Sequence, residues 1–91
     1  MGLTSVVHIS KFQYDVYIGR PSIWGNPFEI GKDGTRSEVI EKYKEYILGN
    51  QELLDLLPSL SDKILGCFCS PKRCHGDIIA DLVNKLEYIA L

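Results

Sequence analysis

The sequence predicts an α/β fold: a small single domain in which about three strands form a partly parallel sheet packed with three helices. Segments rich in β-branched residues and segments of helical apolar periodicity follow one another in the order strand, strand, helix, helix, strand, helix. The chain has 91 residues, the length of one domain, and we expect that domain to span 1–91. Hydrophobic residues make up 45% and charged residues 24%, as in an ordinary globular domain.

Three short segments rich in β-branched residues predict the strands. They cover 5–9, 15–19 and 64–69, and Gly19 ends the second of them. Ligands of parallel α/β sheets bind beyond the carboxyl ends of the strands. We therefore expect a site where the segments after the second and third strands meet, if those two strands run in parallel.

The first predicted helix begins after Thr35, which together with Glu38 forms the Thr-x-x-Glu pattern of a capping box. Gly49 and Asn50 stop this helix. Its apolar residues recur at helical spacing, so one of its faces is expected to be buried in the core. The residues of that face are Val39, Ile40, Tyr43 and Ile47.

Two further helices are predicted from leucine-rich and isoleucine-rich segments. A short one covers 51–57 and is ended by Pro58, and the last begins near His75 or Gly76 and runs toward Tyr88. The expected core residues of the short helix are Leu53, Leu54, Leu56 and Leu57. Those of the last helix are Ile78, Ile79, Leu82, Val83, Leu86 and Ile89.

The net charge of −2 and the sequence pI near 5.6 argue against a binder of long nucleic acid, which usually carries a basic stripe. A small anionic ligand needs only a few local cations, so this class stays open. No long apolar run or N-terminal signal sequence is visible. We therefore expect no membrane partner and a cytoplasmic location, in the host cytoplasm if a phage encodes the chain. Because so short a domain buries little surface, we also expect a homo-oligomer.

All three cysteines and one of the two histidines lie within 65–79, across the junction of the third strand and the last helix. Four side chains there, Cys67, Cys69, Cys74 and His75, could together hold zinc. Their spacing, Cys-x-Cys-x4-Cys-His, is not a common zinc-finger pattern. We expect no metal and no cofactor, with two buried structural cysteines and one loop cysteine, and keep zinc as the alternative.

Cys74 is predicted to lie next to a helix start, where the helix dipole and nearby Lys72 and Arg73 would lower the pKa of its thiol. With His75 or Asp77 beside it, Cys74 could act as a nucleophile. In the simpler interpretation Asp77 complements the helix dipole and His75 caps the first turn. The combination of these residue types favours a functional site at this corner.

A second candidate segment follows the second strand. Arg20 could clamp a phosphate or carboxylate, Trp24 could stack on a base, and Asn26 could hydrogen bond to a base edge. The alternative is that Trp24 and Phe28 form a small core beneath a loop, with Asn26 as a turn residue before Pro27. That alternative does not explain why Arg20, Trp24 and Asn26 occur together.

The segment 31–36, Gly-Lys-Asp-Gly-Thr-Arg, is a glycine-containing turn that leads into a helix start. It resembles a phosphate-binding loop in outline but lacks the Walker spacing. A turn followed by a capping box explains all of it except Arg36. A positive charge at a helix start is unfavourable, and a bound anion would offset that cost.

Three ordered blocks resemble the domain-of-unknown-function family numbered 4326, which is common among phage and bacterial proteins. They are Tyr-Ile-Gly-Arg-Pro-Ser-x-Trp-Gly-Asn-Pro-Phe at 17–28, Gly-x-Asp-Gly-Thr-Arg at 31–36, and Leu-Gly-Cys-aromatic-Cys-x-Pro-x-x-Cys-His-Gly-Asp at 65–77. Two positions depart from the family pattern: Ile23 stands where lysine is frequent, and Phe68 where tryptophan is frequent.

This resemblance implies a compact cytosolic α/β domain of the kind that viruses often encode. It also implies that the polar residues of the three blocks share one site, namely Arg20, Asn26, Asp33, Arg36, Cys74, His75 and Asp77. By analogy with small phage proteins, such a domain could be a sponge that sequesters a nucleotide immune signal.

Three functions follow, and we favour the first. The chain binds a small nucleotide-like anion, such as a cyclic ADP-ribose-type molecule, without reacting with it. Alternatively it is a nucleotide-processing hydrolase or glycosyl transferase that uses Cys74, His75 and Asp77. The third option is a zinc-stabilised interaction module. The first two require the turn after Ile18 and the corner after Phe68 to face a common cavity.

Overall fold

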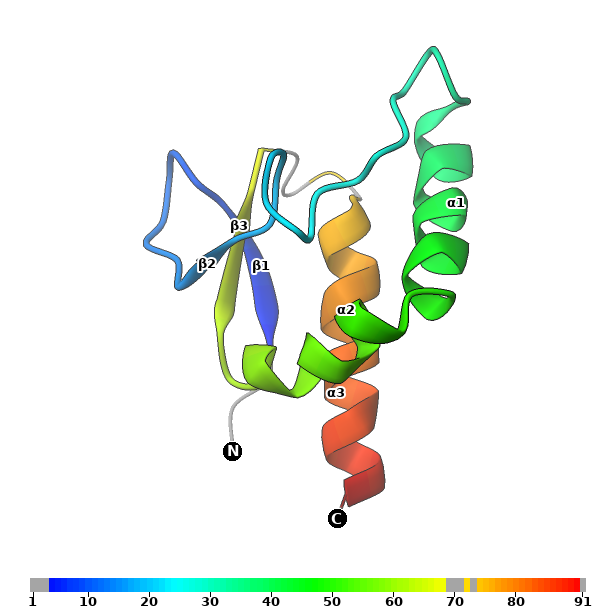
Figure 1. Cartoon of the computed structure of the whole chain (residues 1–91). Helices are drawn as coiled ribbons and strands as arrows, with labels where there is room; N and C mark the ends of the chain where they lie inside the picture. Colours follow the sequence, from blue (N-terminus) through cyan, green and yellow to red (C-terminus); the bar gives the residue numbers. More distant parts are fainter. Residues whose placement is uncertain (1–3, 69–71, 73, 91) are drawn as a thin grey trace.

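The computed structural model describes residues 4–68, 72 and 74–90, with side chains up to residue 85. Its sheet has the strands β1 (Ser5–His8), β2 (Val16–Tyr17) and β3 (Ile64–Cys67), in the order β1-β3-β2. β3 pairs in parallel with both neighbours, so the carboxyl ends of all three strands meet at one edge (Figure 1). The predicted α/β class is confirmed, and the described sheet is parallel throughout.

All three strands are shorter than predicted. The residues on either side of β2 nevertheless also form backbone hydrogen bonds to β3. The N–H of Asp15 donates to the Ile64 carbonyl oxygen at 2.7 Å, and the N–H of Ile18 donates to that of Gly66 at 3.0 Å. β2 is therefore held along the positions predicted for it, although only Val16–Tyr17 has strand geometry. Cys69, the predicted end of the third strand, lies outside the described residues.

The helices are α1 (Arg36–Leu48), α2 (Gln51–Leu56) and α3 (His75–Ala90), and a 3₁₀ turn, η1 (Leu57–Leu60), follows α2. The α-helix ends at Leu56, one residue before the end predicted ahead of Pro58, and the chain continues as η1. Pro58 lies in the first turn of η1, where its missing N–H is not needed for a helical hydrogen bond.

The capping box of α1 is confirmed. The Thr35 hydroxyl accepts a hydrogen bond from the Glu38 N–H at 3.3 Å, and the Glu38 carboxylate accepts one from the Thr35 N–H at 2.9 Å. These bonds lower the pKa of the Glu38 carboxyl. The four residues predicted for the inner face of this helix are all buried: Val39, Ile40, Tyr43 and Ile47.

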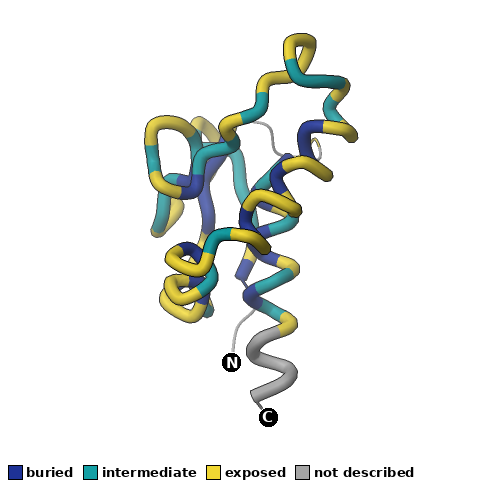
Figure 2. The backbone as a smooth tube through the Cα atoms, turned by 45° about the vertical axis from the view of Figure 1, so that its right-hand side comes forward, coloured by how far each residue is buried: buried dark blue, intermediate teal, exposed yellow. Residues whose placement is uncertain are grey.

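The helices cover one face of the sheet, and α1 packs against α3 (Figure 1). Residues 9–14 cover part of the other face, where a Cβ atom on Gly66 would lie 2.6 Å from the Tyr14 ring. The buried positions are concentrated in β3, α1 and the first half of α3 (Figure 2). From the predicted short helix Leu53 and Leu57 join this core, but Leu56 is 43% exposed, contrary to the prediction, because it lies on the outer side of α2.

The long irregular segment between β2 and α1 is held to the core by two side-chain hydrogen bonds. The buried Tyr43 hydroxyl donates to the Trp24 carbonyl oxygen at 2.8 Å, and the Asn26 amide donates to the Val39 carbonyl oxygen at 3.3 Å. The Trp24 side chain itself is buried in the main hydrophobic cluster. These contacts fix the part of the loop that adjoins the sheet edge.

Candidate ligand pocket at the carboxyl ends of the strands

A pocket of about 570 Å³ lies at the carboxyl ends of β2 and β3, a size typical of small-molecule sites. Four segments contribute to it: the turn after β2, the loop before α1, α1 itself, and the junction of β3 with α3. The expectation that the turn after Ile18 and the corner after Phe68 face a common cavity is confirmed. The lining residues are Gly19, Arg20, Asn26, Phe28, Glu29, Ile30, Arg36, Val39, Ile40, Cys67, Phe68, Cys74 and His75.

His75 connects the start of α3 to the turn after β2. Its Nε2–H donates to the Ile18 carbonyl oxygen at 2.7 Å, since a carbonyl can only accept. The imidazole ring also lies edge-on to Tyr43, with 5.0 Å between the ring centroids. Burial lowers the pKa of His75, and the nearby Arg20 charge lowers it further, while the bond to Ile18 and the Asp77 charge oppose the shift. His75 is therefore neutral at pH 7, with its proton on Nε2.

The lowered pKa of His75 predicts an acid-sensitive fold. The unfolded chain, in which the pKa is near 6.5, binds the proton more readily than the folded chain. Stability should therefore be constant above about pH 6.5 and fall as the pH drops below it, by at most about 1.4 kcal/mol per pH unit. Urea unfolding between pH 7.5 and 5.5 measures this fall. A His75→Gln variant keeps a donor for the Ile18 carbonyl oxygen and should lose the fall in stability that His75 causes. The same dependence of stability on pH in the two proteins would contradict the role given to His75.

The start of α3 is capped by its own residues. The Gly76 N–H donates to the Cys74 sulfur at 3.3 Å, and the Asp77 carboxylate accepts from the Cys74 N–H at 3.0 Å. This is the reciprocal pattern of a capping box, with a thiol in place of the usual hydroxyl. Asp77 is therefore a capping residue that does not line the pocket, which confirms the simpler interpretation for Asp77. His75 does not cap the turn but turns toward Ile18.

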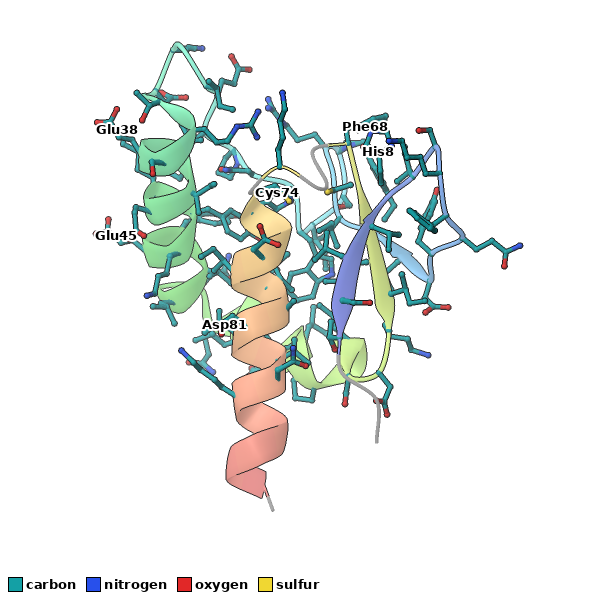
Figure 3. The ribbon with its side chains drawn as sticks, turned by 180° about the vertical axis from the view of Figure 1, so that it is seen from behind. His8, Glu38, Glu45, Phe68, Cys74 and Asp81 are labelled. Carbon is teal, nitrogen blue, oxygen red and sulfur yellow. The ribbon has the colours of Figure 1, made fainter. Side chains whose placement is uncertain are left out.

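The environment of Cys74 contradicts its predicted activation. Its sulfur lies 3.4 Å from that of Cys67, both residues are almost fully buried, and Figure 3 shows Cys74 at the start of α3. The hydrogen bond to Cys67 raises the pKa of the Cys74 thiol, and burial raises it further. Lys72 is exposed at this corner, and Arg73 lies outside the described residues. Cys74 is thus a protonated thiol at pH 7, which is the wrong form for a nucleophile.

The zinc alternative has limited support from the described residues. In that part of the chain no group of three or more His, Cys, Asp or Glu side chains is arranged to hold a metal ion. Cys67 and Cys74 lie together, but the Nε2 of His75 is directed to Ile18. Cys69, the remaining proposed ligand, lies outside the described residues.

The charged lining of the pocket is predominantly positive. Its described lining holds Arg20, Arg36 and the carboxylate of Glu29, whose Oε1 lies 3.0 Å from an Arg20 guanidinium nitrogen. This ion pair is about half exposed, so water and salt weaken it and an incoming anion can compete for Arg20. Arg36 is the first residue of α1, the position at which the sequence predicted that an anion would be favourable.

Two other predicted site residues have structural roles. The Asn26 oxygen accepts from the Phe28 N–H at 2.9 Å while its amide bonds to α1, so Asn26 lines the pocket with both ends engaged. The Asp33 carboxylate accepts from the Glu29 N–H at 2.8 Å and does not line the pocket. Asp33 thereby shapes the turn that carries Glu29, in which Gly31 adopts a φ of 90°.

The aromatic residue at the pocket differs from the one predicted. Trp24 is 4% exposed and belongs to the core, so its ring has no open face for a base and the expected stacking role is wrong. Phe28 and Phe68 line the pocket instead. Figure 3 shows Phe68 with His8 at the same end of the molecule as Cys74. The sequence did contain an indication of this position, because Phe68 is a large aromatic residue directly after the central strand, at its carboxyl end.

Comparison with known proteins supplies the family. A family model described as Domain of unknown function (DUF4326) matches residues 5–85. The chain belongs to the DUF4326 family. It is 42% identical over 89 residues to an uncharacterised 12.4 kDa protein in the nrdA-td intergenic region of Enterobacteria phage T4, with 92% of this chain and 81% of that protein covered. No solved structure matches this chain.

A second viral relative comes from a mimivirus. The DUF4326 chain is 35% identical over 91 residues to an uncharacterised protein of Acanthamoeba polyphaga mimivirus, with 80% of this chain and 69% of that protein covered. Within the described part of the DUF4326 domain, no helix has the length and apolar character needed to cross a bilayer. The three blocks noted in the sequence lie within residues 5–85, which the family model matches, and the chain has relatives in a phage and in a mimivirus.

Proposed function

We propose that this DUF4326 domain binds a small nucleotide-like anion in the pocket at the carboxyl ends of β2 and β3. The observation that carries the proposal is that Arg20 and Arg36 line one cavity in a chain of net charge −2, with Glu29 as the one carboxylate among the described lining residues. Guanidinium groups bind phosphate by paired hydrogen bonds. Location at the carboxyl edge of a parallel sheet is also usual for nucleotide sites.

Binding without reaction is favoured over an enzymatic role. The alternative assigned Cys74 as nucleophile, but its thiol pKa is raised, and its sulfur is hydrogen bonded to the Cys67 thiol and accepts from the Gly76 N–H. Asp77 was the other candidate nucleophile or base, but its carboxylate caps α3 by accepting from the Cys74 N–H. Among the lining residues that the structure describes, Glu29 is the only carboxylate, so a pair for general acid and base catalysis is not formed there.

A viral binder that does not consume its ligand would act by sequestration. The relatives in phage T4 and mimivirus support this proposal because a virus gains from lowering the free concentration of a host signal. The ligand would then be a nucleotide immune signal in the host cytoplasm, such as a cyclic ADP-ribose-type molecule. Two expectations stay predictions: that the chain has no long nucleic acid as a partner, and that it self-associates.

Calorimetric titration with AMP, ADP, ATP and cyclic ADP-ribose tests the proposal. At least one of these nucleotides should bind with a Kd below about 1 mM, equivalent to about −4 kcal/mol. The bound nucleotide should be recovered unchanged after heat denaturation of the complex. Absence of binding in this range would contradict the proposal, and recovery of a product would favour the enzyme that uses Cys74, His75 and Asp77. Metal analysis of the same purified protein tests the zinc alternative.

A further inference from the structure

We propose that the planar base of the ligand stacks on the ring of Phe68. The pocket would therefore bind nucleotides more tightly than sugar phosphates, which have no base. This inference rests on the proposed function, because it assigns the part of the same pocket that contacts the base. It transfers to Phe68 the role that the sequence suggested for Trp24. Any π-face of a base can stack on an aromatic side chain, so the inference does not specify which base.

The exposure of Phe68 is the first observation. Phe68 follows β3 directly and lines the pocket, yet it is 62% exposed. A large part of this residue therefore meets solvent, which is unfavourable for a phenylalanine side chain. A stacked base would remove that surface from water at the edge of the sheet where ligands of parallel sheets bind.

The second observation is that two fixed rings orient Phe68. His8 lies edge-on to it with centroids 6.3 Å apart, and Tyr17 lies edge-on with centroids 6.1 Å apart. Both supports are themselves held: His8 Nδ1 accepts from the Ser10 N–H at 3.1 Å, and the Tyr17 hydroxyl donates to the Arg20 carbonyl oxygen at 2.9 Å. A ring that is held in place by perpendicular neighbours loses little entropy when a ligand stacks on it.

The bond from Tyr17 to Arg20 also places the two parts of the site together. Tyr17 contacts the Phe68 ring and, through its hydroxyl, the main chain of the arginine proposed to bind phosphate. A nucleotide has a planar base and an anionic group joined by a sugar. The pocket offers an aromatic ring and two guanidinium groups within one volume of about 570 Å³, which matches this combination.

Phe28, the other aromatic of the lining, is less suited to the role. It is half-buried, its ring lies edge-on to Tyr46 with centroids 6.4 Å apart, and the Lys42 ammonium lies 5.9 Å from its centre. These neighbours occupy surface that remains open on Phe68. Phe28 is therefore better explained as a wall of the pocket than as its stacking surface.

Titration with AMP and with ribose 5-phosphate tests the assignment, because the two probes differ only in the base. The wild-type chain should bind AMP about tenfold or more tightly than ribose 5-phosphate. Phe68→Ala should remove most of this preference and leave the affinity for ribose 5-phosphate within about twofold. Phe68→Trp should keep the preference, and AMP but not ribose 5-phosphate should quench the fluorescence of the new indole.

Phe12→Ala is the matched control, because Phe12 is also 62% exposed but does not line the pocket. It should leave both affinities unchanged. Equal affinity of the wild type for the two probes, or equal weakening of both by Phe68→Ala, would overturn the role of Phe68 while leaving an anion site. Failure of both probes to bind would overturn this inference, whereas the proposed function falls only if ADP, ATP and cyclic ADP-ribose also fail to bind. A Phe68→Ala variant that changes only the sedimentation of the protein would show a contact between chains instead.

Discussion

An Arg20→Gln/Arg36→Gln variant is expected to bind nucleotide at least about 100-fold more weakly than the wild type. Each arginine is expected to donate hydrogen bonds to the anion, and a hydrogen bond to a charged group contributes about 1.5–3 kcal/mol. Loss of two such contacts costs at least about 3 kcal/mol, which corresponds to more than two powers of ten in Kd. Calorimetry at 50 mM and 300 mM salt measures the loss, and the wild-type affinity should fall as salt increases.

Two variants serve as controls for this effect. Lys11→Gln/Lys63→Gln removes the same number of positive charges from exposed positions outside the pocket lining and should change the affinity little. Glu29→Gln removes the carboxylate that pairs with Arg20 and should strengthen binding of an anion. If the lysine variant weakened binding as much as the arginine variant, the net charge of the chain would explain the effect and the pocket would not.

A Tyr43→Ala variant is expected to lose about 3–5 kcal/mol of unfolding free energy, a large part of the stability of so small a domain. Tyr43 is fully buried, and its hydroxyl donates to the Trp24 carbonyl oxygen at 2.8 Å. Its ring also contacts the imidazole of His75. Removal of the ring therefore opens a cavity and releases the loop that carries part of the pocket, so nucleotide binding should weaken as well.

Tyr43→Phe separates the ring from the hydroxyl. This variant fills the same space but leaves the buried Trp24 carbonyl without its donor, so it should cost about 1–3 kcal/mol. Urea unfolding followed by circular dichroism measures both variants. A Tyr43→Ala protein within about 1 kcal/mol of the wild type would contradict the central position of Tyr43 in the core.

The features that were predictable from the sequence are those set by neighbouring residues. The Thr35-x-x-Glu38 pattern gave the start of α1, because both partners of a capping box lie within one helical turn. The periodicity of Val39, Ile40 and Tyr43 gave its buried face for a similar reason. The predicted strand positions were also close, although β2 has strand geometry only at Val16–Tyr17, where it pairs with β3.

The features that were not predictable depend on contacts between distant residues. Trp24 looked available to a ligand, but the hydrogen bond of its carbonyl oxygen to Tyr43 and the surrounding core bury it. A helix start predicts a lowered thiol pKa for Cys74, whereas contact with Cys67 and burial raise it. Phe68 becomes the exposed aromatic of the pocket only because the end of β3 lies beside β2.

Titration of the ¹⁵N-labelled chain with AMP tests whether the carboxyl edge of the sheet is the binding site. The amide signals of Gly19, Arg36 and His75 should shift together in proportion to occupancy, because these residues line the pocket. Those of Leu53 and Leu57 should not move, because α2 and η1 lie at the opposite end of β3 (Figure 1). Absence of shifts at millimolar AMP, or shifts centred on α2 and η1, would contradict the proposed site.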